Sequence, residues 1–322
     1  MKNNILVFIF IILGFSACDN SIDINAPWRE TPVVFAIIDL GQDSQIIRIQ
    51  KTFQNDENTS NSDVSAIADS LFLKNISVRI TSNNNPNAYK DFIRLAPRKE
   101  AGFFSNKDSS YWGAYMPNWF AGGISYQFKI HSNETGKDYI GNTKMVGKAT
   151  IQYLATIDLI NHDIQTFLYK IDDLGLEHAA LMDLIVRVNY NEVNLANTAD
   201  TTVKYVDYYA KKLVSTSTFN QPRYSQSINK KEFAAGIKQE LTPNANVKRT
   251  FKSLEFVVLG YNSDYKDMLL INAPSGSIIP KFGEYTNISN SIGIFASRTT
   301  TKGTQNLNAL SIDYLNNSVL NP

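Results

Sequence analysis

The chain has few of the residues from which metal centres and covalent cross-links are built. Its 322 residues include one cysteine, Cys18, and three histidines. A single cysteine excludes an intramolecular disulfide and a zinc site made of cysteines, and three histidines leave little material for a histidine cluster. We therefore assign no metal site and no cofactor to this sequence.

An excess of charge of one sign is also missing. Lys and Arg number 31 against 30 Asp and Glu, so the formal net charge is +1. A balanced charge creates no long-range field for a highly charged polymer, because binding to a phosphate backbone needs a surplus of cations. The composition therefore argues against a nucleic-acid partner.

The sequence lacks the common motifs of catalysis. It contains no G-x-S-x-G elbow, no H-E-x-x-H zinc helix and no glycine-rich phosphate loop. A carboxylate pair for glycoside hydrolysis is defined by its separation in space, so it has no sequence motif of its own. We carry two hypotheses: a non-catalytic binding or interaction module and, as the alternative, a surface glycan hydrolase that uses a carboxylate pair.

What is present begins with an N-terminal targeting segment. Lys2 precedes an apolar run over residues 5–15, and small residues follow. This order is typical of a secretory signal peptide, and the run is too short to span a bilayer comfortably. The segment Phe15-Ser16-Ala17-Cys18 resembles the lipobox of bacterial lipoproteins, although most lipoboxes carry Leu where Phe15 stands.

The lipobox implies that the cysteine receives acyl chains after cleavage. We predict a signal peptide over residues 1–17, lipidation of Cys18, and a short polar lipidated tether over residues 18–27. Two or three acyl chains anchor a protein stably, because each buried methylene contributes about 0.8 kcal/mol. The membrane is therefore an expected partner, through the N-terminal lipid.

The mature part of the chain has the patterning of a β protein. In residues 124–131 apolar and polar side chains alternate without interruption, which is the period of a half-buried strand. Clusters of Asn, Gly and Pro between such segments favour turns. Further strands are expected over residues 32–39, 45–53, 74–81, 139–146, 184–190, 202–212, 254–259 and 292–298.

Helical patterns are scarce. Residues 229–241 form the best candidate, because Asn229 can cap the helix and Glu232 stands three residues later, as in a capping box. Residues 263–271 form a second. The sequence therefore predicts a mainly β fold: a β-sandwich over residues 28–147 and a second β-rich domain over residues 148–322, with one or two short helices.

Several segments resemble a known family. Residues 32–39, 47–53 and 284–298 are similar to Bacteroidota cell-envelope lipoproteins that carry a domain of unknown function. The stretch from Gly123 to Tyr126 also resembles the G-x-x-Y strand of carboxypeptidase-regulatory-like sandwiches. The family resemblance implies that the N-terminal sandwich is immunoglobulin-like, and that the protein acts near a TonB-dependent transporter or another envelope protein.

An aromatic cluster is the most suggestive feature outside the N-terminus. It offers large rigid apolar surfaces, which can stack on sugar rings, anchor a protein partner or plug the end of the sandwich. Glycine and proline interrupt it, so we expect an irregular segment. The candidate contact residues are Tyr111, Trp112, Tyr115, Trp119 and Phe120.

A second aromatic group has Tyr205, Tyr208 and Tyr209 interleaved with lysines. Core and edge packing of a strand accounts for it as well as ligand contact does.

For the whole protein we expect a lipid anchor in the outer membrane of the cell, with the periplasmic or surface face left open.

Overall fold

The computed structural model describes residues 30–52, 71–96, 110–152, 156–169, 178–216, 223–272 and 285–321. Within these residues the protein is mainly β, as the sequence predicts. The strands are β1 (Pro32–Asp39), β2 (Ser44–Lys51), β3 (Ile76–Ser82), β4 (Asn85–Arg94), β5 (Tyr111–Tyr115), β6 (Ser125–Ser132), β7 (Asp138–Lys144), β8 (Ile151–Gln152), β9 (Ile164–Tyr169), β10 (Leu181–Asn194), β11 (Asn197–Ser215), β12 (Arg223–Ile228), β13 (Val247–Tyr261) and β14 (Ile292–Gln305).

Short helices lie between and after the later strands. They are α4 (Lys230–Glu240), α5 (Ser263–Ile271), α6 (Ala309–Tyr314) and the π-helical turn η2 (Leu315–Val319). The strands form a large sheet in the order β11-β10-β13-β14-β1-β2-β5-β4-β3-β6-β7 and a small sheet in the order β12-β9-β8. None of the helices in the described residues combines the length and apolar character needed to cross a bilayer.

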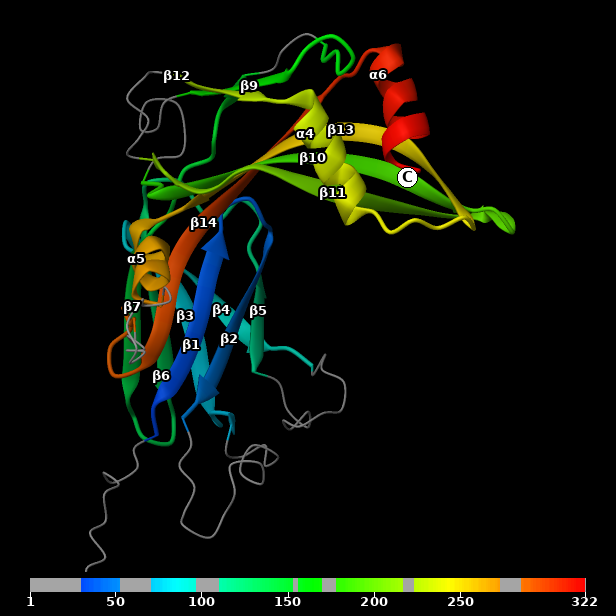
Figure 1. The fold of residues 1–322 in the computed structure, drawn as a ribbon. Coiled ribbons are helices and arrows are strands. Elements are labelled where there is room, and N and C mark those ends of the chain that lie inside the picture. The colour runs from blue at the N-terminus through cyan, green and yellow to red at the C-terminus, as the bar shows by residue number, and fades with distance from the viewer. Residues whose placement is uncertain are drawn as a thin grey trace, which may run out of the picture.

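The first body is sandwich-like. In Figure 1, β1 and β2 lie in front of β3, β4 and β6, and the side chains between them form one core. In β6 the alternation expected for residues 124–131 is confirmed, because Tyr126, Phe128 and Ile130 are buried while their neighbours are partly exposed. The Phe128 ring stacks on Phe295 with centroids 5.3 Å apart, so strands from both layers share this core.

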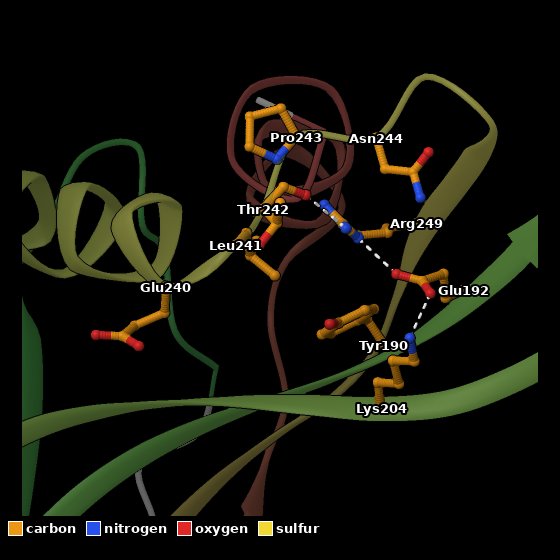
Figure 2. Close-up of a pocket in the computed structure, with 9 residues that line it drawn as sticks. All are labelled: Tyr190, Glu192, Lys204, Glu240, Leu241, Thr242, Pro243, Asn244 and Arg249. Atoms are coloured by element: carbon orange, nitrogen blue, oxygen red, sulfur yellow. Dashed lines mark hydrogen bonds and ion pairs between the residues drawn. The ribbon is translucent and has the colours of Figure 1, made fainter.

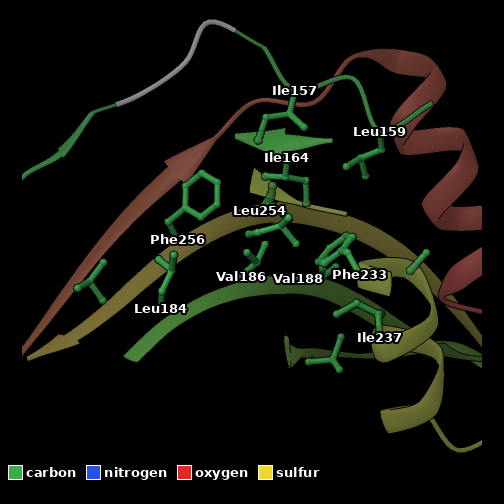
Figure 3. Packing of buried hydrophobic residues seen from close by; sticks show 14 of the residues in the cluster. Ile157, Leu159, Ile164, Leu184, Val186, Val188, Phe233, Ile237, Leu254 and Phe256 are labelled. Carbon is green, nitrogen blue, oxygen red and sulfur yellow. The ribbon is translucent and has the colours of Figure 1, made fainter. Parts of the chain in front are cut away.

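The second body projects sideways from one end of the first (Figure 1). Its long strands β10, β11 and β13 are covered on one face by α4, the small sheet and the C-terminal helices. Figure 3 shows Phe233 and Ile237 of α4 directed at the strands that carry Val186 and Val188. Among the described residues, no helix packs on the opposite face of these strands.

Helix α4 forms where the sequence predicts it. Asn229 accepts hydrogen bonds from the backbone N–H groups of Lys231 and Glu232, which are among the unpaired donors of the first turn. Phe233 and Ile237, one turn apart, are buried on the same face. Helix α5 is also present over residues 263–271, so both expected helices are confirmed.

One strand joins the two bodies. The first half of β14 pairs in parallel with β1, from Val33 opposite Ile292 to Asp39 opposite Arg298. From Arg298 onward, the strand pairs antiparallel with β13. The parallel half needs a glycine, because Gly293 has a positive φ of 117° and a Cβ there would lie 1.9 Å from a carbonyl oxygen of β1.

The same side of β14 faces both cores. Phe295 is buried in the core of the first body, whereas Thr301 and Gly303 lie opposite Val258 and Phe256, which belong to the core of the second. Because these β14 residues all have odd numbers, and strand side chains alternate, both cores lie on one face of a continuous sheet. We call the opposite side of this sheet the outer face.

The strand pairing crosses the domain division expected at residue 147. Residues 292–298 fall in the expected second domain, yet they pair with β1, and Phe295 packs in the core of the first body. In the described residues each body therefore takes strands from distant parts of the chain.

The expectation for the aromatic cluster needs correction. Residues 111–115 form the regular strand β5, paired with β2 and β4, although the aromatic cluster was expected to be irregular. Apolar side chains of β5 point to both faces of the sheet, so its sequence does not show the alternation of apolar and polar residues that is typical of a strand. A third short helix, α6, follows the two expected ones, and it begins at the side-chain cap Asn308.

The junction of the bodies is held by a buried carboxylate on the outer face. Asp39, only 3% exposed, accepts hydrogen bonds from the Arg298 guanidinium at 2.9 Å, from the Thr300 hydroxyl at 2.7 Å and from the backbone N–H groups of Gly41 and Thr300. A buried charge is tolerated only when it is paired and hydrogen-bonded. These bonds tie the end of β1 to the point where β14 changes partner.

We predict that Asp39→Asn lowers the free energy of unfolding by about 1–3 kcal/mol, because a carboxamide leaves donors around it unpaired. Urea denaturation followed by circular dichroism measures this. The matched control is Asp91→Asn, which removes an exposed ion pair with Arg79 and should cost under about 1 kcal/mol. Equal losses in the two variants would contradict the role of Asp39.

Candidate interaction surface

The candidate contact residues of the aromatic cluster divide between the interior and the surface. Trp112 and Phe120 are buried in the core of the first body. Trp119 packs against that core, with its ring centroid 4.9 Å from Phe120 and 5.2 Å from Tyr126. These three rings therefore pack in or against the core of the first body, where they stabilise the fold.

Tyr111 and Tyr115 point the other way. They alternate with Trp112 along β5, so they lie on the outer face. Tyr115 is 68% exposed. The cluster that the sequence presents as one unit therefore supplies core residues on one side of a strand and surface residues on the other.

Strand pairing brings three further exposed apolar side chains beside these tyrosines. Phe35 pairs with Arg48, and Arg48 pairs with Tyr111. In the next row, Ile46 pairs with Gly113 and Gly113 with Ile93, and Ile93 is 68% exposed. Directly opposite residues share a face. We call this surface the apolar patch: Phe35, Ile46, Ile93, Tyr111 and Tyr115.

The apolar patch spans the adjacent strands β1, β2, β5 and β4. Single exposed apolar residues are ordinary, but a contiguous group of large ones marks a contact surface. Arg48 lies in its middle, and within the described ranges no carboxylate pairs with this arginine. The patch therefore offers apolar area together with one cation.

Sequence reasoning missed Phe35, Ile46 and Ile93. In β1 the apolar run is continuous, and such a run is expected when both faces of a strand are buried. A usable signal is the pair Ile46-Ile47, because one of two neighbouring residues in a strand must point outward. When an interior strand of a sheet carries apolar residues on both faces, either each face is covered by other parts of the protein or one face is a binding surface.

A polar pocket of about 350 Å³ lies in the second body. Figure 2 shows Arg249 at its centre, with its Nε donating to Glu192 at 2.9 Å and another nitrogen donating to the Thr242 carbonyl at 2.8 Å. Lys204 contacts the second Glu192 oxygen at 2.5 Å. The residues lining the pocket are Tyr190, Glu192, Lys204, Glu240, Leu241, Thr242, Pro243, Asn244 and Arg249.

The charges of this pocket satisfy one another. Hydrogen bonds from Lys204 and then from Arg249 lower the pKa of Glu192 below its ordinary value. An ionised carboxylate held by two cations is a poor proton donor at neutral pH. The other carboxylate, Glu240, points away from Glu192 in Figure 2, so this pocket gives no support to the alternative hypothesis of a carboxylate pair.

Across the residues described above, no three His, Cys, Asp or Glu side chains come together in a way that could hold an ion. His131 lies on the polar face of β6, with its Nδ1 2.7 Å from an oxygen of Asp138. The cysteine, Cys18, and the acidic segment over residues 171–177 lie outside the described residues.

The second aromatic group is also divided by strand alternation. Tyr208 of β11 faces the covered side, where its ring meets Phe233 edge-on at 5.5 Å. Tyr205 and Tyr209 lie on the outer face and are 58% and 50% exposed. The packing interpretation therefore holds for one of these three tyrosines.

Comparison with known proteins adds little. No family model matches the chain, and no curated protein matches it. Among solved structures, a chain described as "Biofilm associated protein - BSP domain" is 9% identical, with a TM-score of 0.15 over 89% of this chain. The alignment spans 61% of that neighbour, and at this TM-score the likeness carries no argument about fold or function.

The two sides of β5 predict opposite mutational effects. Trp112→Ala should lower the free energy of unfolding by about 3–5 kcal/mol, because it leaves a cavity in the core. Tyr115→Ala should change it by less than about 0.5 kcal/mol. Urea denaturation of both variants tests this, and a large loss for Tyr115→Ala would show that the apolar patch is part of the folded core.

Proposed function

We propose that this chain is a lipid-anchored, non-catalytic interaction module of the bacterial outer membrane, which binds a protein partner of the cell envelope. One observation carries the proposal: in the described residues, five large apolar side chains gather exposed on four adjacent strands of the first body. Exposing an apolar surface of this size to water is unfavourable in free energy. A partner that covers the surface removes this penalty.

The chemistry of the apolar patch favours a protein as the partner. Tyr, Phe and Arg are enriched where proteins meet, because they combine large contact area with a polar end. Tyr111 and Tyr115 combine an aromatic ring with a hydroxyl group, and Arg48 adds a cation. The expected partner surface is apolar and carries a carboxylate opposite Arg48.

The anchor would place the apolar patch close to the membrane. About a dozen residues separate Cys18 from Glu30, where the described structure begins. At roughly 3.4 Å per residue, this tether reaches at most about 40 Å. A membrane-embedded partner such as a transporter lies within that distance, which agrees with what the family resemblance implies.

Cys18→Ala tests the anchor. Loss of the acylated cysteine should move the protein from the membrane fraction to the soluble fraction, because the tether has no other group to hold it in lipid. Cell fractionation followed by immunoblotting measures this, with Ser21→Ala as the control for tether sequence. Persistent membrane association of a Cys18→Ala protein from which residues 1–17 have been removed would exclude the lipid anchor.

The double variant Phe35→Ser with Ile46→Ser tests the apolar patch. We expect it to lose at least about tenfold in affinity for the partner, because hot-spot side chains carry most of an interface's binding energy. Cross-linking in intact cells, with quantitative mass spectrometry, measures the yield of each cross-linked partner.

Leu310→Ser is the matched control, because Leu310 is 62% exposed on α6 in the second body. The supporting result is one envelope protein whose cross-link disappears in the double variant and persists in the control. The partner could instead be lipid, so binding of the non-acylated protein to vesicles is measured alongside. Vesicle binding that depends on Phe35 and Ile46 would replace the protein partner with a membrane surface.

A further inference from the structure

The outer face of β11 carries an exposed strip that is separate from the apolar patch. Val203, Tyr205 and Tyr209 are each at least half exposed. They share a face, because alternate strand residues point the same way. We call these residues the aromatic strip. The reverse face of β11 is covered around Tyr208, as described above, whereas the strip faces solvent.

Tyr205 is a supported flat surface. The guanidinium carbon of Arg187 lies 3.9 Å from the centroid of its ring. Two parallel hydrogen bonds of 2.7 and 2.8 Å hold that guanidinium to Asp207, and this pairing raises the pKa of Arg187. One face of the ring thus lies against a fixed cation. A ligand that stacks on the other face therefore loses little free energy in ordering the Tyr205 side chain.

A second exposed ring, Tyr209, follows further along the strand, with the Lys212 ammonium nitrogen 5.3 Å from its centroid. Four residues at about 3.3 Å each put it roughly 13 Å from Tyr205. A row of polar residues crosses the sheet between the two rings. Asp207 pairs with Arg187, Arg187 with Glu255, and Glu255 with Thr304. The strip therefore has ring, polar row and ring in succession along β11.

The electrostatics select an uncharged ligand. Arg187 is neutralised by Asp207, while Glu255 in the polar row and Lys212 over the Tyr209 ring carry charges of opposite sign. An open sheet face favours a long ligand over a compact one, since a compact ligand needs a concave site. Pyranose rings fit these conditions: their C–H faces stack on the negative face of an aromatic ring, and their hydroxyl groups bond to polar side chains.

We propose that the aromatic strip binds a neutral polysaccharide, which lies along β11 with sugar rings on Tyr205 and Tyr209. The site is distinct from the apolar patch and does not rest on the function proposed above. Binding through the strip requires neither catalysis nor the lipid anchor.

The first body provides a matched control. Arg79 lies 3.8 Å from the centroid of the Tyr89 ring and forms two hydrogen bonds, of 2.6 and 3.0 Å, to Asp91 directly across the strands. Tyr89 is 47% exposed. This triad repeats the geometry around Tyr205. Its outward neighbours on β4, Asp91 and Ile93, include no second aromatic ring.

Affinity electrophoresis of the detergent-solubilised full chain, in gels containing β-glucan, α-glucan, xylan or mannan, tests the proposal. We expect at least one polymer to retard the wild type, and we expect Tyr205→Ala and Tyr209→Ala each to weaken the association about tenfold. Tyr205→Phe keeps the stacking ring, and Tyr89→Ala removes an equivalent triad elsewhere. Both should bind within about threefold of the wild type.

Three outcomes would overturn the proposal. The first is no retardation of the wild type by any of these neutral polymers. The second is unchanged binding by Tyr205→Ala. The third is an equal loss in Tyr89→Ala, which would attribute the effect to general destabilisation of a Tyr-Arg-Asp triad rather than to the strip.

Discussion

The structure depends on one strand that changes its partner. Strand β14 leaves β1 at Arg298 and continues beside β13, and the buried Asp39 ties both neighbours of that point together. A separate linker between two domains would leave their orientation free. Here the backbone hydrogen bonds of one sheet run through the junction, so the orientation of the two bodies follows from the twist and pairing of that sheet.

A shared sheet also creates a shared outer face. The two cores occupy one side of the sheet, and the apolar patch and the aromatic strip occupy the other. Their chemistry differs. The patch is apolar and includes the cation Arg48, which pairs with no carboxylate of the described residues, whereas the strip alternates tyrosine rings with neutralised charges such as Arg187 and Asp207. The first suits a protein surface, and the second suits an uncharged polymer, so one face can serve two kinds of contact.

Prediction from the sequence succeeded where local chemistry decides the structure. The alternation in β6 and the cap of α4 depend on residues a few positions apart, and both elements formed as expected. It failed at β5, where Trp112 is buried and Tyr115 is exposed. Nothing local distinguishes these two aromatics, because their burial depends on which strands pair on either side of β5.

The sequence by itself determined the mainly β class, most strand positions and the two capped helices, since period and capping are local properties. Only the tertiary structure decided which apolar side chains stay in water. Phe35 and Ile46 lie in strands whose sequences predict burial in the core. Tyr205 lies in a strand whose aromatic residues are explained equally well by packing. Their exposure follows from long-range pairing: both cores formed on one side of the sheet, and within the described residues no helix covers the apolar patch or the aromatic strip on the other.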